Sequence, residues 1–105
     1  MPKYLIKASY TEQGVSGLLK EGGSGRRAEI AHMSEAAGGS LEAFYFAFGE
    51  TDVYVIGEFP DNATAAAIAL NVASSGSVTC TTTVLLTPEE IDAAAQHRIS
   101  YRPPG

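Results

Sequence analysis

The stretch Leu41–Phe59, LEAFYFAFGETDVYVIGEF, decides the fold of this chain. Both of its halves are rich in aromatic and β-branched residues, and the segment 49–52 between them, Gly-Glu-Thr-Asp, consists of residues that favour a turn. These features predict a β-hairpin. Its first arm carries apolar residues on both faces, so both faces need cover in the folded protein. The aromatic face of that arm is formed by Phe44, Phe46 and Phe48.

The segments on either side of the hairpin alternate between strand-like and helix-like patterns. In Lys3–Tyr10 the even-numbered residues are apolar or aromatic, which predicts a strand with that face toward the core. The β-branched run 77–86 predicts a last strand. Capping residues and periodicity predict helices from Thr11 to a break at Gly22, over about 26–37, over about 62–75, and from a capping box at Thr87 to about His97.

The helix over 62–75 is rich in alanine, so its buried side has to be chosen from few large residues. A stripe of Ala66, Leu70 and Ala73 lies at helical spacing, and we expect it to face the sheet. The small residues permit close approach of the helix to the sheet.

The predicted order of elements, βα-ββ-αβ with a further helix, is that of the split βαβ or ferredoxin-like fold. It predicts one α+β domain over residues 1–97, with a four-stranded antiparallel sheet, helices on one face and an extra C-terminal helix. Residues 98–105 would form an extended tail. The opposite face of the sheet would be bare, and we expect a second copy to cover it in a homodimer or a higher homo-oligomer.

The composition limits which binding partners and which cellular compartment we expect for this protein. The chain has 105 residues and a formal net charge of −5, and its basic residues are scattered apart from Arg26-Arg27, which argues against nucleic-acid binding. No apolar run approaches the ~20 residues of a membrane span, and the composition of the first residues leads us to expect no signal peptide. Cys80 is the only cysteine, so an internal disulfide is excluded. We expect a cytoplasmic protein that binds neither nucleic acid nor membrane.

Three runs of the sequence together resemble the GYD-domain family of small, mostly bacterial proteins: SYTEQGVSGLLKEGGSGRR, AGGSLEAFYFAFGETDVYVIGEFPDNATAAAIAL and TTTVLLTPEEIDAA. The resemblance extends over roughly Lys3 to Ala95. Gly49 and Asp52 match the ends of the family's Gly-Tyr-Asp motif, while Glu50-Thr51 stands where one tyrosine is usual. The resemblance implies a dimeric α+β barrel fold and no established biochemical activity.

The segment Lys20–Arg27, KEGGSGRR, combines a glycine-rich bend, free backbone N–H groups at a helix start and two guanidinium groups. These are components of an anion site, so Arg26 and Arg27 are candidate anion-binding residues. The Gly-Lys-Ser/Thr ending of a P-loop is missing. The alternative is a flexible connector with solvated arginines.

Glu29, His32 and Glu35 recur at every third position of the second predicted helix. A carboxylate and an imidazole at this spacing can reach one metal ion, and Glu-x-x-His is half of a di-iron signature. The second Glu-x-x-His and its companion glutamates are missing. We therefore expect a polar helix face turned to water, with no metal and no cofactor.

Lys7 and Glu58 place charges within strands that are central in the predicted sheet, where an unpaired charge is costly. One possibility is a structural salt bridge between the two. The other is that Glu58 faces a pocket as a carboxylate that transfers protons. Tyr10, Tyr45 and Tyr54 could line such a pocket or serve as plain packing.

Two functional hypotheses follow. In the first, the protein is a non-catalytic homo-oligomeric module that binds a small, partly aromatic molecule in a cleft between the sheet and the helices. In the alternative, it is a cofactor-free oxygenase or isomerase, like other dimeric α+β barrel proteins, with Glu58 or His32 as the proton acceptor. The candidate ligand-binding residues are Lys7, Tyr10, Tyr45, Phe46, Phe48 and Tyr54.

Overall fold

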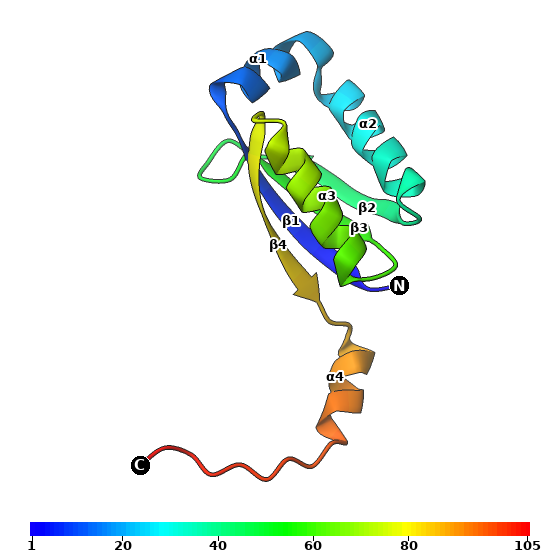
Figure 1. Ribbon diagram of the computed structural model, residues 1–105, viewed down its shortest axis with the longest axis vertical. Coiled ribbons are helices and arrows are strands. Elements are labelled where there is room, and N and C mark those ends of the chain that lie inside the picture. The colour runs from blue at the N-terminus through cyan, green and yellow to red at the C-terminus, as the bar shows by residue number, and fades with distance from the viewer.

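The computed structural model describes residues 1–105 and contains four strands and four helices (Figure 1). The strands are β1 (Lys3–Tyr10), β2 (Ser40–Phe46), β3 (Val53–Glu58) and β4 (Val78–Leu85). The helices are α1 (Glu12–Glu21), α2 (Gly23–Ala36), α3 (Asn62–Ser74) and α4 (Pro88–Ala95). The predicted hairpin is formed by β2 and β3, and the loop between them covers residues 47–52.

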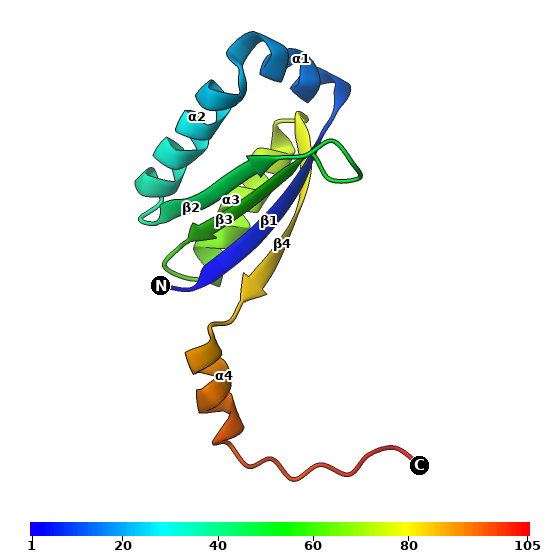
Figure 2. The ribbon, with the colours of Figure 1, turned by 180° about the vertical axis from the view of Figure 1, so that it is seen from behind.

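The strands form one antiparallel sheet in the order β2-β3-β1-β4. Helix α3 lies across one face of the sheet, and α1 and α2 arch over the same side (Figure 1). The opposite face carries no helix and is seen unobstructed in Figure 2. The structure confirms the predicted ferredoxin-like α+β architecture, with β1 and β3 as the central strands.

The core is small and lies at the end of the sheet where β1 begins. Tyr4 is 1% exposed and its ring centroid lies 5.9 Å from that of Phe59, which packs with it against Ala65 of α3. The Tyr4 hydroxyl donates a hydrogen bond to Asn62 Oδ1 over 2.7 Å, so this buried phenol is satisfied. This cluster anchors the start of α3 to the sheet.

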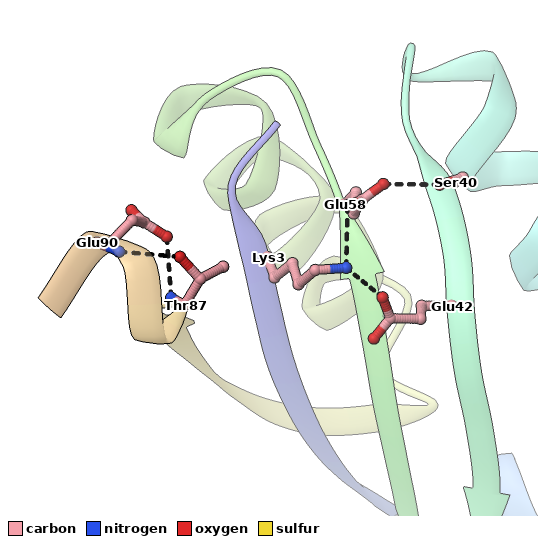
Figure 3. Close-up of polar contacts among 6 residues, drawn as sticks. All are labelled: Lys3, Ser40, Glu42, Glu58, Thr87 and Glu90. Carbon is pink, nitrogen blue, oxygen red and sulfur yellow. Dashed lines mark hydrogen bonds and ion pairs between the residues drawn. The ribbon is translucent and has the colours of Figure 1, made fainter. Parts of the chain in front are cut away.

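Three of the four predicted helices are capped at their start by a side chain that the sequence supplies, whereas α2 follows Gly22 and has no side-chain cap. Thr11 accepts a hydrogen bond from Gly14 N, and Asp61 accepts one from Thr64 N. At α4 the capping box is complete, because Thr87 accepts from Glu90 N while the Glu90 carboxylate accepts from Thr87 N (Figure 3).

The boundary between the first two helices differs from the expectation. Helix α2 begins at Gly23 instead of near Arg26, so only Gly22 separates it from α1. Gly22 has a φ of 83°, a left-handed value that glycine adopts readily and that turns the chain between the two helices.

The predicted buried stripe of α3 is wrong. Leu70 is 72% exposed, and Ala66 and Ala73 are exposed as well. The side that faces the sheet carries Ala65, Ile68, Ala69 and Val72. The alanine-rich sequence is apolar all round the helix, so its periodicity does not identify the buried side. The buried side is the one on which Ala65 contacts Tyr4 and Phe59.

Helix α4 and residues 96–105 extend away from the end of β4 and lie outside the body of the domain (Figures 1 and 2). Every residue from Pro88 onward is exposed, including Ile91, Ile99 and Tyr101. None of the helices has the length and apolar character needed to cross a membrane.

Candidate ligand-binding cleft

A cleft of about 380 Å³ lies between the sheet and helices α1, α2 and α3. Of its 22 lining residues, 14 are hydrophobic. Both the volume and the apolar character are typical of small-molecule sites, which range over roughly 300–1,000 Å³. The cleft is therefore the best-formed candidate site in the protein.

The floor of the cleft is the helix-facing side of the sheet. Strand pairing brings its residues together, because Ile6 lies opposite Val55 and Ala8 lies opposite both Val53 and Cys80. The predicted alternation in β1 is thus confirmed, with the even-numbered residues on the helix side. The sheet residues that line the cleft are Ile6, Ala8, Tyr10, Phe44, Val53, Val55, Val78 and Cys80.

The walls are formed by one side of each of the three helices. Helix α2 contributes Ile30 and Met33, which both line the cleft. The apolar wall residues are Leu18 of α1, Ile30 and Met33 of α2, and Ile68, Ala69 and Val72 of α3. Small residues at Ala8 and Ala69 leave space in the middle of the layer, where larger side chains would fill it.

The aromatic residues of β2 close the side of the cleft near the α1–α2 junction. The rings of Phe44 and Phe46 pack edge to face, with centroids 5.2 Å apart. Phe46 lies against Gly23, where an added Cβ would come within 3.1 Å of the ring. Phe46 therefore supports the start of α2, while Phe44 faces the cleft.

Arg26 is the only cationic residue that lines the cleft. Its Nη1 lies 3.4 Å from Glu21 Oε2, and its Nε is buried without a hydrogen-bond partner. Arg27 is exposed and does not line the cleft. The structure thus separates the two arginines that the sequence placed together in one candidate anion site.

Tyr10, a candidate ligand-binding residue from the sequence, lines the cleft. Its backbone N–H donates a hydrogen bond to the Asp52 carboxylate over 2.9 Å, which ties the hairpin loop to the end of β1. Burial raises the pKa of the Tyr10 phenol, and the nearby Arg26 charge opposes this increase. Tyr10 therefore presents a protonated phenol to the cleft at neutral pH.

The other aromatic candidates lie elsewhere. Tyr45 and Tyr54 are directly paired across β2 and β3, and they are 71% and 41% exposed on the open face of the sheet. Phe48 lies fully exposed in the hairpin loop. The expectation that Tyr45 and Phe48 line the same cleft as Tyr10 is wrong, because Tyr45 alternates with Phe44 and so points to the opposite face, and β2 ends at Phe46, before Phe48.

Glu58 also lies on the open face of the sheet, away from the cleft. The register places Lys3 opposite Glu58 and Lys7 opposite Tyr54, so the expected Lys7–Glu58 pair is replaced by a pair between Lys3 and Glu58. Lys3 also contacts Glu42, and Ser40 donates to Glu58 (Figure 3). Hydrogen bonding to Lys3 lowers the pKa of Glu58 below its usual value.

Lys7 is exposed on the open face of β1 and lines a separate, shallow hollow of about 280 Å³. Hydroxyl side chains of Ser9, Thr51, Thr79 and Thr81 surround it. This hollow is almost entirely polar, unlike the cleft on the other side of the sheet.

The triad on α2 does not converge on one point. His32 and Glu35 are exposed and do not line the cleft, whereas Glu29 does. The structure contains no group of three or more histidine, cysteine, aspartate and glutamate residues arranged to hold a metal ion. His32 and Glu35 form an exposed polar side of the helix, whereas Glu29 borders the cleft.

Several residues of the cleft were not candidates from the sequence. Gln13 and Glu21 line it from α1, together with Gly14, Gly17 and Leu18. The available signal was their spacing, because positions 14, 17, 18 and 21 share one face of a helix. The contribution of α3 was hidden by its alanine content.

The fold and the cleft define a small ferredoxin-like α+β protein with an apolar pocket between the sheet and its helices. The model of one family, the GYD domain, matches residues 4–95. The chain belongs to the GYD-domain family. No curated protein and no solved structure matches it.

Proposed function

We propose that this protein is a small-molecule binding module whose ligand, mainly apolar and partly aromatic, occupies the cleft between the sheet and helices α1–α3. The observation that carries the proposal is the apolar lining of a cleft of about 380 Å³. An apolar concavity of this kind gains free energy when an apolar molecule displaces water from its walls.

The chemistry of the walls supports an apolar ligand body. The Phe44 ring provides an aromatic surface, with Ile30, Met33 and Ile68 as aliphatic contacts. Burial raises the pKa of the Cys80 thiol, so Cys80 stays neutral and acts as part of the apolar floor. Aromatic and methionine side chains adapt well to flat ring systems.

The alternative, a cofactor-free oxygenase or isomerase, needs a proton acceptor beside the bound molecule. The two candidates were Glu58 and His32, and both lie outside the cleft. Glu58 is in addition paired with Lys3 on the opposite side of the sheet. Of the two carboxylates that do line the cleft, Glu21 is paired with Arg26 and Glu29 is exposed to water, so binding without catalysis is the better-supported proposal.

Native mass spectrometry of the untagged protein from a cell extract tests the proposal. We expect a bound organic mass that is released by collisional activation. The Ala69→Phe variant, which fills the cleft from α3, should lose this mass, whereas Ala66→Phe on the exposed side of the same helix should keep it. An equal bound mass in both variants would place the ligand outside the cleft.

We further propose that two copies pair through the open face of the sheet. Tyr45 and Tyr54 form an exposed aromatic pair on this face, and Lys7 provides a cation that forms no ion pair within the chain, with Glu50 in the lining of the same hollow. The C-terminal arm of residues 86–105 exposes the apolar residues Leu86 and Ile91 and carries acidic residues at its start. Its apolar residues could pack on the tyrosine pair, and its acidic residues could pair with Lys7. A second copy of the chain supplies both surfaces at once.

A further inference from the structure

The polar side chains of the cleft are gathered at one end. The charged and amide residues that line it all come from α1 and the first turns of α2, namely Gln13, Glu21, Arg26 and Glu29. Ser75 and Ser77 lie in the connection from α3 to β4. The Thr11 hydroxyl at the start of α1 donates to Gly76 O over 2.8 Å, which brings this connection to the same end (Figure 1).

The opposite end of the cleft is purely apolar. Ile6 and Ile68 line the cleft there and pack against the cluster of Tyr4, Phe59 and Ala65. The Tyr4 hydroxyl is already bonded to Asn62, so it offers nothing to a ligand. A bound molecule therefore meets hydrocarbon at this end and polar groups at the other.

Unused hydrogen-bond donors are present at the polar end. The Arg26 guanidinium has Glu21 as its polar neighbour at 3.4 Å, which is longer than an ordinary charged hydrogen bond. The Tyr10 hydroxyl takes part in no hydrogen bond within the chain. The hydrogen bond between Tyr10 and Asp52 uses the backbone N–H of Tyr10 and leaves the hydroxyl free. Unused donors in a half-buried site favour a ligand that brings an acceptor.

The charges at this end disfavour an anionic acceptor. The positive charge of Arg26 is balanced by Glu21, and Glu29 adds a second carboxylate to the same lining. A carboxylate on the ligand would bring a third negative charge into a partly desolvated site, which is unfavourable. A carbonyl oxygen can accept hydrogen bonds from both donors without adding charge.

We infer that the ligand of the cleft is an aromatic or alicyclic ketone or a similar uncharged carbonyl compound, with its apolar body toward Ile6 and Ile68 and its carbonyl oxygen beside Tyr10 and Arg26. This inference rests on the proposed binding function of the cleft. It adds the chemical class of the ligand and its direction in the site.

Three probes with the same ring system test the inference by ¹H–¹⁵N NMR titration at pH 7. They are 2-acetylnaphthalene, which has a carbonyl group, 2-ethylnaphthalene, which has none, and 2-naphthoate, which is an anion. We expect 2-acetylnaphthalene to bind about tenfold more tightly than either of the others. Its amide shifts should include Gln13 at one end of the cleft and Ile68 at the other.

Variants assign the preference to the two donors. Arg26→Gln and Tyr10→Phe should each reduce the affinity for 2-acetylnaphthalene several-fold while leaving that for 2-ethylnaphthalene unchanged. The control Arg27→Gln alters the neighbouring exposed arginine and should change neither affinity. Because Tyr10→Phe keeps the ring, it tests the hydroxyl even if the Arg26 variant folds poorly.

The possible outcomes separate this inference from the proposed function. If 2-ethylnaphthalene binds as tightly as the ketone, or 2-naphthoate binds at least as tightly, the inference is overturned while the apolar cleft remains a binding site. If none of the three probes binds, both proposals are overturned.

Discussion

Lys3 of β1 and Glu58 of β3 lie opposite each other on the two central strands, with Lys3 Nζ 3.0 Å from Glu58 Oε1 (Figure 3). The pair lowers the pKa of Glu58 and raises that of Lys3, chiefly through hydrogen bonds of Lys3 with Glu42 and Glu58. Glu58 therefore contributes stability above its usual pKa near 4.5, and the contribution is lost as the pH falls below it. The stability that Lys3 contributes is complete below pH 10.5, its usual pKa, and is lost as the pH rises further.

Substitution of Glu58 by Gln should accordingly lower the free energy of unfolding at neutral pH by a modest amount, because both side chains are about one-third exposed and solvent screens the pair. The difference from the unsubstituted protein should shrink as the pH falls below 4.5. Urea unfolding of both proteins at a series of pH values measures this difference in the free energy of unfolding. A difference that does not change with pH would contradict an electrostatic origin.

Gly14 of α1 lies close to Ser77, the residue that precedes β4. A Cβ at residue 14 would lie 2.0 Å from the carbonyl oxygen of Ser77, so Gly14→Ala has to displace the helix from the sheet. We expect a loss of about 1–3 kcal/mol in the free energy of unfolding. Gly17→Ala on the same helix meets nothing within 4 Å and should stabilise the protein by up to ~1 kcal/mol. Equal effects in the two variants would contradict the close contact.

The proposed dimer depends on the open sheet face, on which Tyr54 is exposed. Tyr54→Glu places a charge at the centre of that interface and should raise the dimer dissociation constant at least about tenfold. Leu19→Glu changes an apolar residue on α1 that is more exposed than Tyr54, and it should leave the mass of the dimer unchanged. Sedimentation velocity distinguishes the species. A dimer that persists in the Tyr54 variant would exclude this face.

Helix α4 depends on its capping box, since it has eight residues and a helix of that length is marginal alone. Thr87→Ala removes the hydroxyl that accepts from Glu90 N and should destabilise α4 by about 1 kcal/mol. The ¹³Cα shifts of residues 88–95 should move toward coil values, while the urea midpoint of the sheet stays the same. Glu89→Gln, in the same turn but outside the capping box, is the control.

Local patterns in the sequence predict most of the architecture correctly. The hairpin, the inward face of β1 and the capping box at Thr87 each depend on residues close together in the chain. Alternation, turn residues and caps report such local preferences directly. The order of elements then leaves few possible topologies, and the ferredoxin-like sheet is the one observed.

The candidate site is predicted only in part, because its residues come from eight separate elements or connections. Tyr10 and Arg26 are found from the sequence and meet at the cleft, whereas Tyr45 and Glu58 are also candidates and lie on the other side of the sheet. Which residues of a strand face the helices changes with a shift of one residue. Alternation places Tyr45 on the face opposite to Phe44, and Glu58 on the face of Tyr54, but it does not show which of the two faces the helices cover, and tertiary packing decides that.

The sequence by itself determined the elements, their order, the helix caps and the family, because these follow from interactions between near neighbours or from similarity along the chain. The tertiary structure alone decided three further features. It pairs Glu58 with Lys3 instead of Lys7, it turns Ile68 and Val72 of α3 toward the sheet, and it leaves a cleft beside Arg26. These features depend on strand register and on how far the helices stand from the sheet, and both are set by contacts between residues distant in sequence.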